Sequence, residues 1–258
     1  MNNTVKETLS KVPAVTLGFW VIKIAATTLG ETGGDAVTMT MNLGYLVGTL
    51  IFGVILIAGV SAQIFAKALH PFLYWTVVVA TTTVGTTLAD FVDRSLGIGY
   101  LGGSSILFVL VLASLGLWYR VCGSVSVATV ASPKVELFYW MTILFSQTLG
   151  TALGDWLADD TGLGYEGGAL VFAACLAVVV VAYFFTQISR TLLFWAAFIL
   201  TRPLGATVGD LLDKPHAKGC LEFGRFSASA VLIVFMVVCI LVLPQRAGVR
   251  PGNPTPTS

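Results

Sequence analysis

The chain has 258 residues, of which 56% are hydrophobic and only 10% are charged, and its formal net charge is +1. Soluble domains carry about 25% charged residues, so this composition indicates an integral membrane protein. The small net charge and the lack of a polybasic segment exclude a nucleic-acid-binding surface. No Gly-x4-Gly-Lys-Ser/Thr sequence occurs, so direct coupling to ATP is not expected.

Eight apolar stretches follow one another, each long enough to cross about 30 Å of hydrocarbon as a helix. They span about residues 13–34, 45–66, 71–90, 103–121, 136–155, 168–188, 191–210 and 227–243. These stretches leave no room for a soluble domain. The expected fold class is all-α: a polytopic membrane protein with eight transmembrane helices surrounded by lipid, its oligomeric state left open by the sequence.

One phrase closes every odd-numbered stretch, which indicates four tandem repeats of two helices each. An aromatic residue and a tryptophan open each repeat, and a glycine and then an aspartate follow. The members are Trp20, Trp75, Trp140 and Trp195; Gly30, Gly85, Gly150 and Gly205; and Asp35, Asp90, Asp155 and Asp210. Since two crossings return the chain to its starting side, the repeats are parallel, and pseudo-symmetry about an axis along the membrane normal is expected.

The repeats are spaced by 55, 65 and 55 residues, which indicates that a pair of repeats was duplicated. The expected organisation is an N-terminal half at 1–122, a linker at 123–134 and a C-terminal half at 135–245. A tail rich in Pro and Thr, at 246–258, is expected to be disordered.

Basic residues flank the termini and the connections between repeats, whereas 11 of the 13 acids lie in the turns within repeats. These basic residues are Lys6, Lys11, Lys67, Arg120, Lys134, Arg190, Arg246 and Arg250. By the positive-inside rule, both termini are expected in the cytoplasm.

The four motif aspartates are the first candidates for a cation site. An acid at a helix C-terminus is disfavoured by about 0.3–1 kcal/mol, so four such acids require a reason. Hard divalent cations bind carboxylate and carbonyl oxygens, and a bound cation would supply that reason. A solvated turn acid, or an acid that caps the next helix, is the alternative.

Repeat one adds Glu31, four residues before Asp35 and therefore on the same helical face. This pair is the strongest candidate for metal coordination. Asp93 and Asp213 follow the motif aspartates of repeats two and four by three residues, and we include them among the candidate ion-binding acids.

Small residues recur four apart around the motif, a spacing that lets helix backbones approach closely in lipid. The glycines concerned are Gly30, Gly34, Gly85, Gly150, Gly154, Gly205 and Gly209. Helix packing is their expected role. Local unwinding of the helix, which would expose carbonyl oxygens to an ion, is a compatible second role.

Two basic residues, Lys23 and Arg202, fall inside predicted spans, where charges are costly and usually paired or functional. We expect Lys23 to pair with an acid such as Glu31, and Arg202 with a motif aspartate. In a transporter such a base occupies the empty site and leaves when the cation binds. A purely structural pair is the alternative.

The repeated tryptophans and Gly-x4-Asp phrases resemble a family of bacterial membrane proteins that is catalogued as a repeat of unknown function. The resemblance covers about residues 13–243. It implies the bacterial inner membrane as the location. Some members are linked to manganese efflux, so the resemblance also implies manganese as the ion.

We therefore expect a secondary transporter that exports divalent cations, manganese above all, in exchange for protons, with no enzymatic activity and no resident cofactor. Metal ions and protons would compete for the same carboxylate oxygens. A cation channel or membrane sensor with an outer ring of carboxylates is the alternative. An intramembrane aspartyl protease is a remote one, because Thr32, Ala152 and Thr207 replace the first glycine of its Gly-x-Gly-Asp signature.

Overall fold

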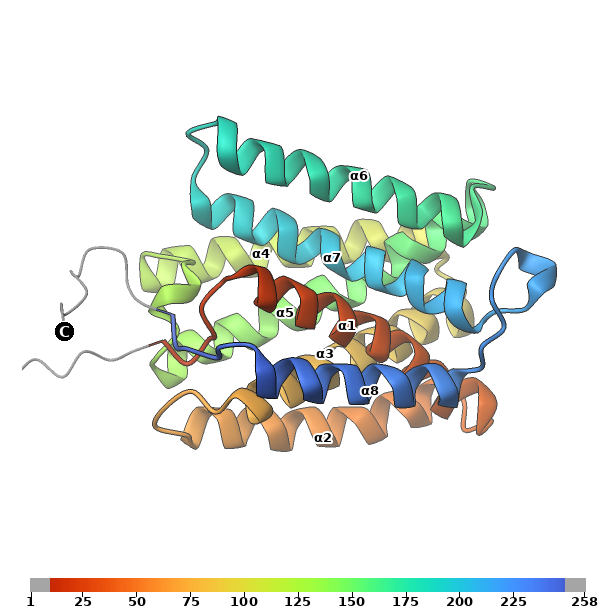
Figure 1. Ribbon diagram of the computed structural model, residues 1–258, viewed down its shortest axis with the longest axis horizontal. Coiled ribbons are helices and arrows are strands. Elements are labelled where there is room, and N and C mark those ends of the chain that lie inside the picture. Colours follow the sequence, from red (N-terminus) through yellow and green to blue (C-terminus); the bar gives the residue numbers. More distant parts are fainter. Residues whose placement is uncertain (1–9, 249–258) are drawn as a thin grey trace, which may run out of the picture.

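The computed structural model describes residues 10–248, which form eight long α-helices lying side by side and no β-strand (Figure 1). The helices are α1 (Leu17–Asp35), α2 (Tyr45–Phe65), α3 (Pro71–Asp90), α4 (Tyr100–Cys122), α5 (Pro133–Asp155), α6 (Gly164–Phe185), α7 (Arg190–Asp213) and α8 (Arg225–Val242). The order of two helices per repeat agrees with the expectation from the sequence.

Six of the eight described helices are long and apolar enough to cross a membrane, namely α2, α3, α4, α6, α7 and α8. The eight expected helices are all present, but α1 and α5 are less apolar than the other six. Each of these two carries charged or amide side chains among its buried residues, such as Lys23 in α1 and Gln147 in α5.

As expected, Asp35, Asp90 and Asp155 are the last residues of the α-helices α1, α3 and α5, but these helix ends are not free. Three π-helical turns continue α1, α3 and α5 directly after Asp35, Asp90 and Asp155: η1 (Ala36–Thr40), η2 (Phe91–Ser95) and η4 (Trp156–Asp160). In repeat four, α7 itself runs on from Asp210 to Asp213. The backbone carbonyls beside the acids are therefore inside helical turns, and π-turns of this kind are frequent at functional sites.

The odd-numbered helices form an inner ring, in which α1 and α5 each pack against both α3 and α7. The even-numbered helices lie outside, and each packs against the inner helix of the following repeat: α2 on α3, α4 on α5 and α6 on α7. The last helix, α8, packs in the same way on α1, the inner helix of the first repeat. The two predicted halves therefore share one continuous arrangement.

Glycine is required where the inner helices meet, because a Cβ atom at each motif glycine would overlap the neighbouring helix. Gly30 faces Thr82, Gly85 faces Gln147, Gly150 faces Arg202, and Gly205 faces Thr27. Gly34, Gly154 and Gly209 face Thr86, Ala206 and Glu31 one turn further along. All seven lie within unbroken α-helix, so they serve close packing, and none of them unwinds its helix.

Equivalent residues of the inner helices, taken every fourth position, are all buried. In order towards the acids they are Phe19, Tyr74, Tyr139 and Phe194; Lys23, Val78, Ile143 and Phe198; Thr27, Thr82, Gln147 and Arg202; Glu31, Thr86, Thr151 and Ala206; and the four motif aspartates. The hydroxyls of Tyr74 and Tyr139 hydrogen-bond at 2.7 Å. Side chains thus fill the centre of the ring.

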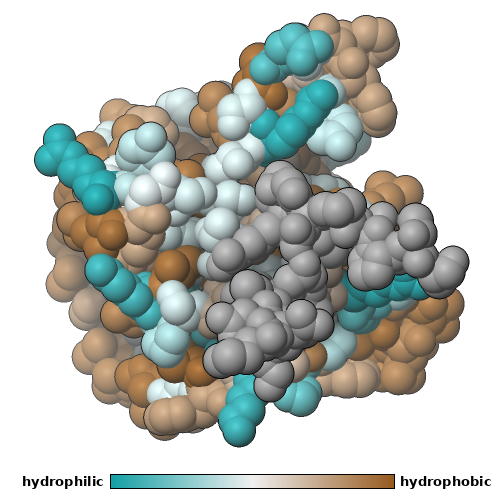
Figure 2. Space-filling model, turned by 90° about the vertical axis from the view of Figure 1, so that its left-hand side faces the viewer, coloured by the Kyte–Doolittle hydropathy of each residue, from teal (hydrophilic) through white to brown (hydrophobic). Residues whose placement is uncertain are grey.

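Both described chain ends lie at the end of the molecule opposite the acids (Figure 1). Exposed Lys67, Arg120, Lys134 and Arg190 lie there as well, beside helix ends. Figure 2 views this end, where hydrophilic side chains are framed by hydrophobic ones. The predicted separation of a basic end from an acidic end is therefore present; Lys6 and Arg250 lie outside the described residues.

Part of the predicted disordered tail has a defined structure. Ala14 N donates to Arg246 O at 2.8 Å, and Gly248 N donates to Val12 O at 2.9 Å, so residues 246–248 pair with the N-terminal segment. Beside them, Lys11 forms an ion pair with buried Glu136 at 2.6 Å. The backbone amides and carbonyls of two extended segments satisfy each other here, which explains the order.

Candidate metal-ion site

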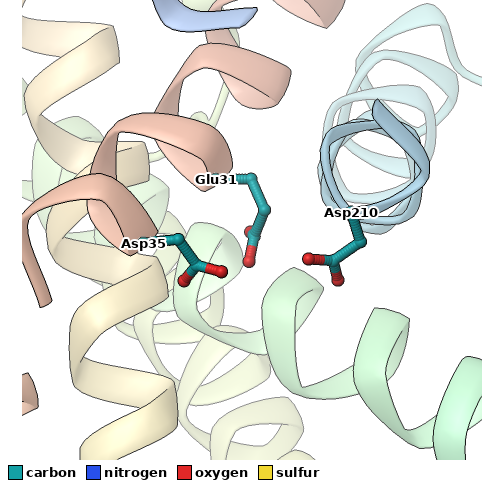
Figure 3. A group of neighbouring side chains, drawn as sticks. All are labelled: Glu31, Asp35 and Asp210. Carbon is teal, nitrogen blue, oxygen red and sulfur yellow. The ribbon is translucent and has the colours of Figure 1, made fainter. Parts of the chain in front are cut away.

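Three buried carboxylates, those of Glu31, Asp35 and Asp210, converge between α1 and α7 (Figure 3). One oxygen from each lies within 4.8 Å of the others, and the residues are only 1–3% exposed. Glu31 and Asp35 share one face of α1 because they are four residues apart. Gly209 lets α7 approach, since a Cβ there would lie 2.8 Å from Glu31 Cβ.

Arg202 balances part of this negative charge; it lies in α7, eight residues before Asp210. Its Nη2 lies 2.9 Å from Glu31 Oε2 and donates to Thr86 Oγ1 at 2.6 Å and to the hydroxyl of Thr151. Thr86 and Thr151 occupy the positions in α3 and α5 that Glu31 occupies in α1. One guanidinium therefore ties α7 to the three other inner helices.

Lys214, the residue after α7, lies among the same acids. Its Nζ is 3.3 Å from Asp35 Oδ2 and 3.1 Å from Asp210 Oδ1. Burial disfavours its charge, but the carboxylates of Asp210 and Asp35 outweigh burial and raise the pKa of Lys214 above its ordinary value. Asp35 Oδ1 has no hydrogen-bond partner among the described residues.

The remaining motif aspartates form a second pair between α3 and α5, bridged by Arg94. Its Nε lies 3.0 Å from Asp90 Oδ1, and its Nη2 lies 3.1 Å from Asp155 Oδ2. The four aspartates at this end are thus divided into two pairs, each held by a base, and Thr86 and Thr151 stand where repeat one has Glu31.

The two additional candidate acids lie apart from the three converging carboxylates. Asp213 accepts a hydrogen bond from Arg225 Nε at 2.8 Å, and Arg225 Nη2 is 3.6 Å from Asp35 Oδ2. Asp93 packs against Gly103 of α4, and neither of its carboxylate oxygens has a hydrogen-bond partner in the described part of the chain.

The expected partners of the two buried bases, Lys23 and Arg202, were wrong. Lys23 Nζ lies 3.3 Å from Gln147 Oε1 and 4.1 Å from the centre of the Phe198 ring. Eight residues of helix, about 12 Å, separate Lys23 from Glu31, which is too far for an ion pair. Arg202 lies on the adjacent helix α7, one helical turn farther from the motif aspartates than Glu31 does. Its guanidinium therefore reaches Glu31 rather than a motif aspartate.

All four motif aspartates are at most 2% exposed, so the alternative of solvated turn acids is wrong. Buried charges of one sign are costly unless opposite charges lie beside them. Here Lys214 and Arg94 are those charges, and both were missed in the sequence. Each stands four residues after a motif aspartate, a spacing that places opposite charges on one helical face and was therefore detectable.

The three converging carboxylates offer only oxygen ligands, which suit hard divalent cations.

A family model described as Repeat of Unknown Function (DUF347) matches the chain four times, over residues 18–68, 73–123, 138–189 and 193–246. These matches coincide with the four helix pairs and confirm the predicted repeats. No curated protein and no solved structure matches the chain.

Proposed function

The chain belongs to the family of the DUF347 repeat, and from the site that its repeats assemble we propose that it is a secondary transporter of divalent metal cations. The observation that carries the proposal is the convergence of the buried carboxylates of Glu31, Asp35 and Asp210. Manganese is the first ion to test, because carboxylate oxygens suit Mn²⁺ and the family resemblance implies it.

Lipid would surround the outer helices. Apolar side chains of α2, α4, α6 and α8 are exposed, and six helices have the length and apolarity to cross a bilayer. By the positive-inside rule, the basic end with both described chain ends faces the cytoplasm. The ring axis then runs along the membrane normal with the four repeats arranged about it, and the acids lie towards the outer face of a bacterial inner membrane.

Transport by a carrier agrees better with the centre of the ring than conduction by a channel. Buried side chains fill the axis, and Arg202 crosses it from α7 to Thr86 and Glu31. The acids also form two base-bridged pairs instead of an open ring of carboxylates. A cation would therefore pass only after the inner helices rearrange, which is the behaviour of a carrier.

Protons are the proposed counter-ion. A carboxylate that coordinates a metal must first be free of its proton, so metal binding and protonation exclude each other at Glu31, Asp35 and Asp210. A proton gradient across the membrane would then drive the metal out. No second ion is needed for this exchange.

The test is Mn²⁺ flux into proteoliposomes that contain the full chain and a metal-sensitive dye, with and without a pH gradient. Wild type should give saturable flux that the gradient accelerates, and Asp35→Asn and Asp210→Asn should abolish it. Asp160→Asn, which changes an exposed acid at the same end, is the matched control and should transport normally. Equal flux through Asp35→Asn and wild type, or no flux of manganese, iron, cobalt, zinc or calcium, would overturn the proposal.

A further inference from the structure

The two base-bridged aspartate pairs are built to one plan. Arg94 follows Asp90 by four residues in repeat two, and Lys214 follows Asp210 by four residues in repeat four. Each base joins the aspartate of its own repeat to the aspartate of the next repeat around the ring, Asp155 in one case and Asp35 in the other. The pairs are therefore equivalent in position, and their differences can be compared directly.

The first difference is how firmly each base is held. Arg94 lies within the π-turn η2, and its guanidinium also donates to the hydroxyls of Tyr45 and Tyr100, at 3.2 and 3.0 Å. Lys214 follows the end of α7 with an extended backbone, and its ammonium has one hydrogen bond in the described structure, to Asp35. Arginine provides a rigid, planar set of donors, whereas lysine is a compact charge on a flexible chain.

The second difference is the number of acids around each base. Beside Lys214, Glu31 adds a third carboxylate to Asp35 and Asp210, whereas threonines stand at the corresponding positions beside Arg94. Lys214 Nζ thus touches two of the three carboxylates that make up the candidate metal-ion site. An ammonium and a divalent cation cannot both occupy these oxygens, because each would repel the other at contact distance.

We propose that Lys214 is a tethered competitor of the transported cation, whose ammonium fills the site until a divalent cation displaces it, whereas Arg94 is a permanent link between α3 and α5. This inference rests on the proposed function, since it concerns the same site. Because the ammonium is attached to the chain, it returns as soon as the metal leaves. The acids are then neutralised in the empty carrier, which avoids the large cost of unpaired buried carboxylates.

A place for the displaced ammonium lies on the outer side of the site. The Tyr165 ring centre is 5.9 Å from Lys214 Nζ, and the face of an aromatic ring attracts an ammonium. The Tyr165 hydroxyl in turn donates to Asp159 Oδ1 at 3.2 Å. A lysine side chain that swings over Tyr165 therefore approaches the carboxylate of Asp159, which Lys218 Nζ also approaches to 3.8 Å.

The test is equilibrium binding of Mn²⁺ to the purified full-length protein in detergent, measured by calorimetry for wild type, Lys214→Met and Lys214→Gln. Removal of the competitor should tighten Mn²⁺ binding about tenfold or more, the scale expected when a tethered ligand is lost. Lys67→Met, which removes an exposed lysine at the opposite end of the molecule, should bind as wild type does. Arg94→Met should lower stability and leave the Mn²⁺ affinity unchanged.

The outcomes separate the two proposals. Tighter binding by both Lys214 variants, or binding by these variants where wild type binds none, supports the tethered competitor. If wild type binds Mn²⁺ and either properly folded Lys214 variant binds it equally or more weakly, the competitor is refuted and the transport site stands. If neither wild type nor the variants bind Mn²⁺, the metal site itself fails, and the inference fails with it.

Discussion

A single methyl group added at Gly85 should separate two inner helices. An ideal Cβ at Gly85 would lie 2.9 Å from both the Gln147 carbonyl carbon and the Thr148 nitrogen of α5. Ordinary contacts lie at about 3.5–4.0 Å, so α3 and α5 would have to part by about 0.6–1.1 Å. Backbone atoms cannot rotate out of the way as a side chain can, and overpacking of this kind costs about 1–3 kcal/mol.

Gly53 supplies the matched control, because it lies within α2 and a Cβ there would meet no atom within 4 Å. Replacing glycine by alanine inside a helix gains about 1 kcal/mol in helix propensity at either position. The difference between Gly85→Ala and Gly53→Ala therefore isolates the packing cost, and we expect Gly85→Ala to be less stable by about 1–3 kcal/mol.

The assay is unfolding of each purified variant by a denaturing detergent, followed through tryptophan fluorescence. The signal is suitable because Trp75 of α3 and Trp140 of α5 are buried in the folded protein and become exposed on unfolding. Gly53→Ala should match or exceed wild type in stability. If the two variants agree within about 0.5 kcal/mol, the reasoning that glycines set the spacing of the inner ring is refuted.

Three further predictions use the same preparations. Arg202→Met should lower the free energy of unfolding by about 3–5 kcal/mol, because Glu31 is left as a buried unpaired charge. Adding Glu31→Gln should restore much of this loss, and a double mutant in which the two losses simply add would contradict the prediction. Lys11→Met should lower the free energy of unfolding by about 3–5 kcal/mol, because it leaves the buried carboxylate of Glu136 without its partner. The control Lys67→Met changes an exposed lysine and should cost little, so equal stability of the two variants would contradict the prediction. Mn²⁺ affinity, measured by calorimetry, should fall when the buffer is made acidic, because a carboxylate must be free of its proton to coordinate the metal, and a rise in affinity would refute that competition.

Much of the architecture was predictable from repeated residues. The spacing of Trp75, Gly85 and Asp90 recurs in all four repeats, so one register places equivalent residues at equal depths on four helices. Helix order, the basic and acidic ends, and the convergence of Glu31 and Asp35 all follow from this periodicity, because each depends on residues close together in the chain.

Apart from Arg94 and Lys214, whose spacing from Asp90 and Asp210 is local, the parts that were missed do not follow from the spacing within one repeat. The Arg202–Glu31 ion pair joins α7 to α1 and depends on how these two helices are aligned along the ring axis. Residue spacing within a single repeat does not predict that alignment. Arg225 reaches Asp35 from α8, and no local pattern marks that contact. The π-turn after Asp35 likewise has no residue signature, so the continuation of the helix beyond this acid was not predicted.

The packing of α8 on α1 has a consequence for how the protein is made. The chain between α1 and α8 requires roughly 10–40 s of synthesis at about 5–20 residues per second, so the first helix waits for its last neighbour. Throughout that interval Glu31 and Asp35 are present on a helix whose α7 and α8 contacts do not yet exist. Folding of this molecule therefore ends when α8, the last helix to be synthesised, packs on α1, the first.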